Sequence, residues 1–353
     1  MYQATEVPSN ASNADMPLIT MKDINIITLV PLSLVLVVGV FGNALCMYVF
    51  GWRKRKFRNP YESLLLILAV NDFFSSMIIP LLTIYGTVTE YKQWHFGTVG
   101  CKILPSTISV SVTISEGILL LIAFERHKSI ISPLRPSIRW AFNAIWLAIV
   151  VCIAIVIVSP YTYSLHIVTD KAYGVRTCLP NKQHLNEIFI HSIGSLGRDL
   201  IVTIAFIIMS TRTAKAIHRK TSLLETSRRK RLENSKKARK ILVVVVVVFS
   251  ACVLPLDLFQ TAFYSIVVSK TSVSQQTYQV FIACNAFLTV LQVSNSATNI
   301  VIYSRMHQDF KRGLFAFARR SNRAVRTSIN RITFRRSYQE EDGIIDININ
   351  NFE

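Results

Sequence analysis

Apolar residues gather into seven long blocks that are separated by shorter polar segments. A helix that crosses about 30 Å of hydrocarbon at about 1.5 Å per residue needs about 20 residues, and every block is long enough for that. The fifth block is the weakest, because the adjacent charged residues Arg198 and Asp199 interrupt it. The pattern predicts an all-α fold, a bundle of seven transmembrane helices at residues 25–50, 61–86, 101–126, 140–163, 187–212, 239–267 and 278–304.

The segment after the seventh block has a different periodicity. Phe310, Leu314 and Phe317 recur at three- and four-residue spacing, and Lys311 and Arg312 lie between them. This alternation is typical of a short amphipathic eighth helix that lies on a membrane surface. The sequence therefore predicts four parts, which are an outer tail at 1–24, a seven-helix domain at 25–304, the surface helix at 305–318 and a disordered tail at 319–353.

Positive charge is concentrated in every second connection. The chain has 39 Lys and Arg against 20 Asp and Glu, a net charge of +19, although only 17% of its residues are charged. Soluble domains carry about 25% charged residues, so an ordinary soluble protein is not expected. Most of the cations follow the first, third, fifth and seventh blocks, and cationic loops stay in the cytoplasm. We expect a multi-pass plasma-membrane protein with an extracellular N-terminus and its longest cytoplasmic loop at 212–240.

The remaining composition narrows the partners and the chemistry. A cation near anionic lipid gains about 1 kcal/mol, so membrane lipid explains the basic loops better than nucleic acid does. The outer tail has a glycosylation sequon at Asn10 and no apolar segment of the signal-peptide type, so the first block is expected to act as its own anchor. The six cysteines have no zinc-like spacing, and no set of His, Ser and Asp indicates an enzyme.

A few polar side chains lie inside the apolar blocks. Each costs about 2.5 to 3.5 kcal/mol on insertion scales, so each should face the bundle interior and have partners there. One carboxylate among hydroxyl and amide oxygens suits a small hard cation such as sodium, or a water network. Purely structural bonding between the helices is an equal alternative. The residues of this set are Asn43, Asp72, Ser115, Asn295, Ser296 and Asn299.

Short motifs on all seven blocks carry a family resemblance. Gly42-Asn43, the LAVND segment at 68–72 and the WHFG segment at 94–97 come first, and Glu125-Arg126-His127 follows in the third block. Later signals are Trp146, then Phe249, Cys252 and Pro255, and finally Asn295-Ser296, Asn299, Tyr303 and Phe310. In this order and placement, the chain resembles the class A, rhodopsin-like G-protein-coupled receptors.

The resemblance implies roles for particular residues. Cys101 and Cys178 are expected to form a disulfide that holds the second outer loop over the bundle. At the inner end, Glu125 is expected to hold Arg126 until activation frees it, and Leu134 and Tyr303 complete the region that couples to the G protein. Phe249 and Pro255 provide the activation pivot, since proline bends a helix.

The same resemblance implies the partners. An extracellular ligand shifts the receptor towards a conformer whose inner cleft binds a heterotrimeric G protein. Serines and threonines in the inner segments are acceptors for a receptor kinase, whose phosphates would add charge that pairs with arginine and would recruit arrestin. No cofactor is expected, apart from an allosteric sodium ion at Asp72.

Three residues depart from the family pattern. Val253 replaces the tryptophan of the sixth-helix motif, Ile300 replaces the proline of the seventh-helix motif, and His127 replaces the tyrosine beside the arginine. These changes affect the efficiency of activation and not the fold. They leave a second hypothesis, a seven-span scavenging receptor without signalling, and a third, a transporter, is disfavoured because we find no inverted repeat.

The ligand pocket is the least determined part. The last block has no lysine for a retinal Schiff base, and Ile108 occupies the place where aminergic receptors carry an aspartate, so neither an opsin nor an aminergic receptor is expected. Helical rise places Glu116 and Arg198 at similar depths, about 15 Å and about 21 Å above the inner mouth, so we expect them to pair. Whether this is a structural network or a ligand contact stays open, and the candidates are Glu116, Arg198, Asp257 and Gln260.

Overall fold

The protein is described by a computed structural model that contains seven helices long and apolar enough to cross a membrane. The described residues are 21–52, 60–89, 92–131, 140–170, 174–221, 226–269, 274–306, 310–313, 315, 316 and 319. The prediction of a seven-helix bundle is confirmed, and residues 310–313, 315 and 316 are helical as well. Two predicted site residues, Asn10 and Leu134, lie outside the described residues.

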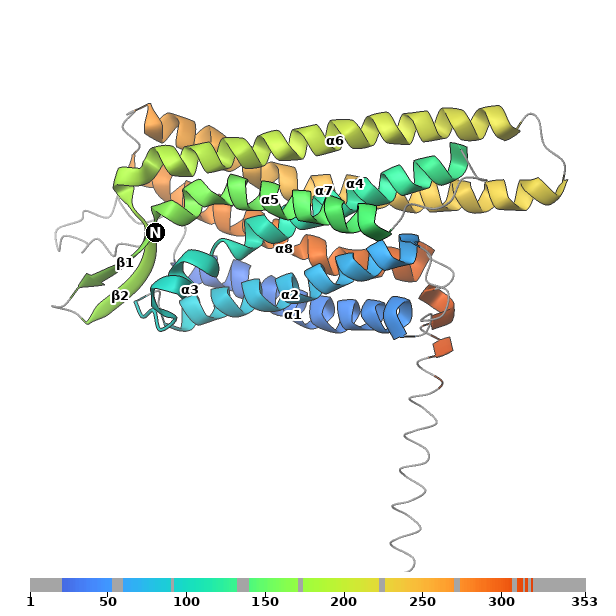
Figure 1. Ribbon diagram of the computed structural model, residues 1–353. Coiled ribbons are helices and arrows are strands. Elements are labelled where there is room, and N and C mark those ends of the chain that lie inside the picture. The colour runs from blue at the N-terminus through green and yellow to red at the C-terminus, as the bar shows by residue number, and fades with distance from the viewer. Residues whose placement is uncertain are drawn as a thin grey trace, which may run out of the picture. The chain divides into compact units, whose positions relative to one another are not determined.

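The seven spans run alternately in opposite directions through the bundle (Figure 1). The third span consists of two pieces, a short α3 and a longer α4, with turn residues at 104–106 between them. Short π and 3₁₀ segments, η1 (Tyr48–Trp52) and η2 (Lys182–His184), adjoin the ends of two helices. The helices are α1 (Met21–Met47), α2 (Pro60–Val88), α3 (Gly97–Ile103), α4 (Thr107–Ile131), α5 (Trp140–Ser164), α6 (Leu185–Thr221), α7 (Thr226–Val268) and α8 (Gln275–Met306).

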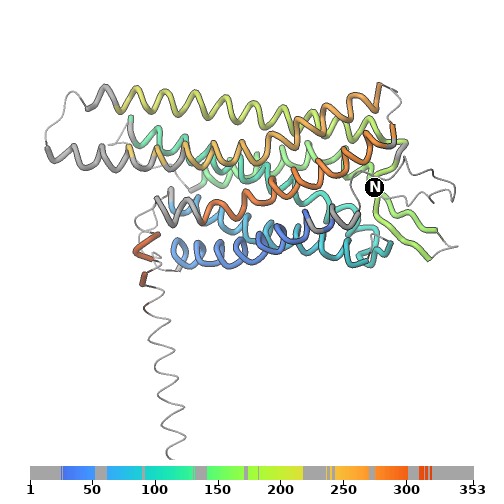
Figure 2. The backbone as a smooth tube through the Cα atoms, turned by 180° about the vertical axis from the view of Figure 1, so that it is seen from behind, coloured from blue at the N-terminus to red at the C-terminus, as the bar shows by residue number. Residues whose placement is uncertain are grey.

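The third span lies at the centre of the bundle. Helix α4 packs against α2, α5, α6 and α7, while α8 packs against α1, α2 and α7 (Figures 1 and 2). The third span is also the most enclosed, with 61% of its most apolar window buried against 22% for α5. Side chains on α4 can therefore contact most of the other spans, and the polar groups that they carry are placed to link them.

The distribution of apolar and polar side chains is that of a protein surrounded by lipid. Large apolar side chains such as Phe41, Val156 and Ile201 are about 70% exposed. Buried side chains include two dozen polar or charged ones, with Asp72 and Asp199 among the most enclosed. Because a polar group in hydrocarbon is costly, these residues face inward and contact one another.

One helical connection differs from the sequence prediction. The long inner loop expected at 212–240 is wrong, because α6 continues to Thr221 and α7 begins at Thr226. Figure 1 shows both helices extending beyond the end of α4. The reason is composition, since Ala, Lys, Arg, Leu and Glu fill these segments and all favour helix in water as well as in lipid. Basic residues that we assigned to a loop therefore sit on two helices.

A β-hairpin that the all-α prediction did not include covers one end of the bundle. Strand β1 (Leu165–Asp170) pairs antiparallel with β2 (Val175–Pro180), and Gly174 takes a positive φ of 63° where the chain enters β2. The expected disulfide between Cys101 and Cys178 is present and ties β2 to α3. We call this end of the bundle, marked by the hairpin, the hairpin end, and the opposite one, marked by Arg126, the basic end.

Candidate functional site

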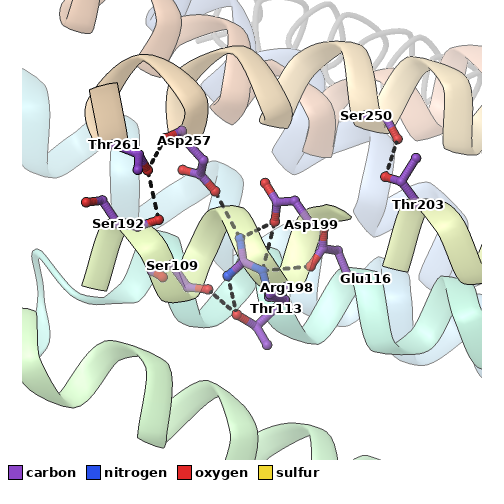
Figure 3. Close-up of polar contacts among 10 residues, drawn as sticks. All are labelled: Ser109, Thr113, Glu116, Ser192, Arg198, Asp199, Thr203, Ser250, Asp257 and Thr261. Carbon is purple, nitrogen blue, oxygen red and sulfur yellow. Dashed lines mark hydrogen bonds and ion pairs between the residues drawn. The ribbon is translucent and has the colours of Figure 1, made fainter. Parts of the chain in front are cut away.

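An arginine with several acidic neighbours lies inside the bundle (Figure 3). Arg198 Nε is 2.8 Å from Glu116 Oε2 and 2.9 Å from Asp199 Oδ1, and Nη2 is 2.6 Å from the same Asp199 oxygen. Nη2 also lies 3.2 Å from Asp257 Oδ2, and Nη1 donates to Thr113 Oγ1 at 2.6 Å. We call these five residues the arginine cluster.

The arginine cluster joins three helices. Glu116 and Thr113 come from α4, Arg198 and Asp199 from α6, and Asp257 from α7. Every one of these side chains is buried, and Asp199 is only 1% exposed. The predicted pairing of Glu116 with Arg198 is therefore present, and the arrangement compensates charges that would be costly in hydrocarbon if they stood alone.

The sequence places Asp199 in the bundle interior with Arg198 but does not predict that the two side chains contact each other. Adjacent residues on a helix point in different directions, so sequence spacing gives no reason to pair Arg198 with Asp199. The arginine side chain is long enough to bend back to its neighbour, which sequence reasoning did not consider. The available signal was the rarity of two adjacent charged residues in a membrane span, each of which needs a partner.

The fourth pocket candidate, Gln260, lies on the hairpin side of the arginine cluster. Its Nε2 donates to Asn285 Oδ1 at 2.8 Å, which joins α7 to α8. Three aromatic rings stack beside it along α7 and α8, with 5.4 Å between the centroids of Phe259 and Phe281 and 3.5 Å between those of Phe263 and Phe281. This side of the bundle therefore offers an aromatic and amide surface next to the charged one.

A second cluster surrounds Asp72, which is 1% exposed. Ser115 Oγ donates to Asp72 Oδ1 at 3.2 Å, and Asn299 Nδ2 donates to Oδ2 at 2.6 Å. Asn71 Nδ2 donates to Ser115 Oγ at 2.8 Å and to Ser111 Oγ at 3.0 Å. We call these five residues the aspartate cluster, in which the donors to the carboxylate are neutral.

The remaining predicted polar residues lie beside the aspartate cluster. Asn43 Nδ2 donates to the Ser296 carbonyl at 3.0 Å, and Ser76 Oγ donates to Ser296 Oγ at 3.0 Å. Asn295 is also buried, at 5% exposure. Sequence reasoning missed Asn71, Ser76 and Ser111, although Ser111 and Ser115 are four residues apart and so share one face of α4.

The basic end holds the predicted lock. Arg126 Nε lies 3.8 Å from Glu125 Oε2, and His127 Nδ1 lies 2.9 Å from Thr213 Oγ1, which joins α4 to α6. A cavity of about 10 Å³ is lined by Ala123, Arg126, Met209, Ser210, Thr213 and Arg239. That volume holds about one water molecule, so these six side chains are packed together, and we call this packed arrangement the closed basic end.

A family model described as 7 transmembrane receptor (rhodopsin family) matches residues 42–303. The chain belongs to this receptor family. It is 24% identical to neuropeptide Y receptor type 6 of Mus musculus over 312 residues, which cover 82% of this chain and 79% of the relative. It is 23% identical to somatostatin receptor type 2 of Mus musculus over 319 residues, which cover 86% of this chain and 80% of the relative. It is 25% identical to chemerin-like receptor 1 of Bos taurus over 298 residues, which cover 79% of this chain and 77% of the relative.

These matches settle the class of function. The chain is a rhodopsin-like G-protein-coupled receptor for an extracellular ligand, and the family and its relatives are receptors. The alternatives of a scavenging receptor or a transporter are not favoured. The clusters and the closed basic end are therefore features of a signalling receptor.

The receptor's departures from the family pattern have packing partners. Val253, in place of tryptophan, is 1% exposed, and Phe249 one turn earlier is 4% exposed. Ile300, in place of proline, packs against Gly42, where a Cβ atom would stand 2.8 Å from Ile300 Cδ1. Because Gly42 has no side chain, Ile300 packs directly against the backbone of α1, and α1 and α8 approach closely there.

The predicted pivot residue lies inside a continuous helix. Pro255 falls within α7, where it lacks an amide to donate and weakens the helix at that turn. Asp257 of the arginine cluster follows two residues later. Tyr303 lies in α8, but its side chain is outside the described part of the receptor. Its expected role in coupling stays a prediction.

Proposed function

We propose that this receptor responds to an extracellular peptide and activates a heterotrimeric G protein. The arginine cluster carries the proposal, because it joins α4, α6 and α7 in the middle of the bundle, where a signal must pass between the ends. The peptide class is supported by the names of the relatives, which include a neuropeptide Y receptor and a somatostatin receptor. Gln260, Asn285 and the aromatic rings near them are the proposed ligand contacts, together with Glu116, Arg198 and Asp257.

In this proposal the hairpin end faces the outside of the plasma membrane. The disulfide Cys101–Cys178 supports this orientation, because disulfides persist in oxidising surroundings. The basic residues of α6 and α7 support it too, since cationic segments stay in the cytoplasm. The N-terminal tail is then extracellular and Asn10 is open to glycosylation.

Ligand binding shifts the receptor towards a conformer with an open basic end. The pivot is Pro255, and rotation of α7 about it would move Arg239 away from the small cavity at Arg126. The ion pair of Glu125 with Arg126 opens in the same step, and Arg126 with Leu134 receives the G protein. Membrane lipid at the basic helices, a receptor kinase and arrestin are further proposed partners.

We also propose a sodium ion as an allosteric ligand of Asp72. The residues fit, because in the described part of the chain this buried carboxylate accepts from two neutral groups, the Ser115 hydroxyl and the Asn299 amide. Sodium chloride should raise the thermal stability of the purified receptor more than potassium chloride at equal ionic strength. Asp72→Asn should remove that difference, and a difference that persists would assign it to another site.

The test of the proposed function is nucleotide exchange on purified G proteins. The full-length receptor in lipid nanodiscs should accelerate exchange by at least one G-protein subtype when a peptide library is screened. Arg126→Ala should remove the acceleration while leaving peptide binding in place. The proposal fails if a peptide binds and no subtype in the panel responds.

A further inference from the structure

The arginine cluster has more acidic groups than its single cation can neutralise. If Glu116, Asp199 and Asp257 were all ionised, the cluster would carry a net charge of −2 with Arg198 included. All four side chains are at most 8% exposed, so water does not compensate the excess. Buried carboxylates without a counter-charge take up protons instead.

The contacts of the guanidinium place the remaining negative charge. Asp199 Oδ1 accepts from both Arg198 Nε and Arg198 Nη2, at 2.9 Å and 2.6 Å. Glu116 Oε2 lies 2.8 Å from Nε, and Asp257 Oδ2 lies 3.2 Å from Nη2, so each of them meets a single nitrogen. Asp199 is therefore the carboxylate that the cation compensates most fully.

Two protons bring the charge of the cluster to zero. With one proton on Glu116 and one on Asp257, the single negative charge lies on the side chain that accepts twice from the guanidinium. Glu116 and Asp257 then still contact Arg198 through their carboxyl oxygens.

The other groups around Asp199 do not change this count. Gln292 on α8 is buried and neutral, so it adds no charge. His191 on α6 contacts the Ile157 carbonyl at 2.9 Å and stacks on Tyr161 of α5. The titratable or charged groups that face the cluster from the described helices are Glu116 of α4, Tyr161 of α5, His191 and Arg198 of α6, and Asp257 of α7.

We propose that the arginine cluster is a proton-binding site, which holds two protons on Glu116 and Asp257 in the closed receptor and releases the Asp257 proton to water on activation. Asp257 is the one member of the cluster on α7 (Figure 3), and Pro255 lies two residues before it in the sequence. Rotation of α7 moves Asp257 away from Glu116 and Asp199, so the acidic neighbours that favour its protonated form are lost. Water then solvates the carboxylate.

The sign of the pH dependence follows from this release. The closed conformer, which is the one described here, binds one more proton than the open conformer. A rise in pH therefore favours the open conformer, by up to about tenfold per pH unit for one proton. The number of bound protons is a property of the receptor alone. Only the second experiment below, which measures nucleotide exchange, rests on the proposed coupling to a G protein.

The first experiment counts protons without a G protein. Infrared spectra of the purified receptor in nanodiscs should contain carbonyl bands of protonated carboxyl groups at neutral pH. Glu116→Gln and Asp257→Asn should each remove one such band, since each replaces a protonated carboxyl group with an amide of similar shape. Ser195→Ala, an equally buried change on α6 one turn away, is the control and should remove none. If neither cluster variant removes a band, the proposal is overturned.

The second experiment tests release. Basal nucleotide exchange should increase several-fold from about pH 6 to about pH 8 for the wild type and Ser195→Ala, after subtraction of the rate without receptor. Asp257→Asn should show a flat profile, because its amide cannot ionise. A flat wild-type profile, or an unchanged slope in Asp257→Asn, would overturn release on activation. If the receptor accelerated no exchange at any pH, the proposed function would be overturned. The number of bound protons would then be decided by the infrared experiment alone.

Discussion

Thr113 and Ser115 lie two residues apart on α4, yet their hydroxyl groups serve different clusters. Thr113 accepts a hydrogen bond from the guanidinium of Arg198, and Ser115 donates one to the carboxylate of Asp72. The aspartate cluster surrounds one acidic group with neutral donors, whereas the arginine cluster sets one cation among three acidic groups. The same helix therefore carries two different solutions to the burial of charge.

The two solutions join different helices. The aspartate cluster links α2, α4 and α8, and the arginine cluster links α4, α6 and α7. Loss of one neutral donor leaves the other donors in place, so the aspartate cluster should weaken in steps. Loss of the one cation of the arginine cluster removes the shared partner of Glu116, Asp199 and Asp257 and leaves a buried negative charge uncompensated, so this cluster should fail as a unit. Helix α7, which is proposed to move during signalling, is thus held to α4 and α6 by the arginine cluster, the one of the two clusters that should not weaken in steps.

Removal of the cation should have the largest effect. Arg198→Met keeps the length and apolar stem of the side chain but leaves Glu116, Asp199 and Asp257 without their guanidinium. We expect the free energy of unfolding to fall by about 3 to 5 kcal/mol, as it does when a buried ion pair loses one partner. The measurement is the midpoint of thermal unfolding of the purified receptor, together with surface expression in cells.

A double variant separates charge from packing in that experiment. Arg198→Met combined with Asp199→Asn removes one acidic group with the cation, so it should recover part of the lost stability. If the double variant is no more stable than Arg198→Met, the comparison between the clusters is wrong, because packing and not charge balance then controls the loss.

Within the aspartate cluster the largest effect should come from Asn299. Asn299→Leu has a similar volume and removes the donor that lies 2.6 Å from Asp72 Oδ2, so a buried acceptor is left unsatisfied. We expect a loss of about 1.5 to 3 kcal/mol in the free energy of unfolding, which is smaller than for Arg198→Met. Equal losses in the two variants would contradict the stepwise behaviour of this cluster.

The sequence could predict the spans, because crossing hydrocarbon requires about 20 apolar residues and that requirement is visible in the residue pattern. It could also predict that Asp72 contacts polar residues of other spans and that Glu116 meets Arg198, because depth along a helix follows from residue number. Both predictions use regularities of single helices. They need no knowledge of how the helices turn about their axes.

The sequence could not predict contacts that depend on the rotation of each helix about its axis, or helix ends that lie in water. The place of Asp199 depends on which way the Arg198 side chain bends, and the contact of His127 with Thr213 depends on how α4 and α6 are turned towards each other. The ends of α6 and α7 were assigned to a loop because apolar pattern stops at the membrane surface, while helix propensity continues beyond it. Hydropathy marks where a helix leaves the lipid and not where it ends.

A smaller effect in the arginine cluster should come from Thr113. Thr113→Val has nearly the same shape and removes the acceptor that lies 2.6 Å from Arg198 Nη1. The guanidinium keeps its contacts with the three acidic side chains, so we expect a loss of about 1.5 kcal/mol, the low end of the range for a hydrogen bond to a charged group. Thermal unfolding measures it, and an unchanged midpoint would show that the guanidinium does not need this acceptor.

The smallest effect should come from the matching change on the other side of α4. Ser115→Ala removes a hydroxyl that donates to Asp72 Oδ1 at the longer distance of 3.2 Å and accepts from Asn71 Nδ2. Asn71 keeps its contact with Ser111, and Asp72 keeps its contact with Asn299, so we expect a loss of about 0.5 to 1 kcal/mol. Both variants change one buried hydroxyl on the same helix. The difference between their unfolding midpoints therefore reports how strongly each cluster depends on its hydroxyl, and not a general effect on α4. If Ser115→Ala costs more than Thr113→Val, the aspartate cluster depends on its neutral donors more strongly than the arginine cluster depends on its acceptor.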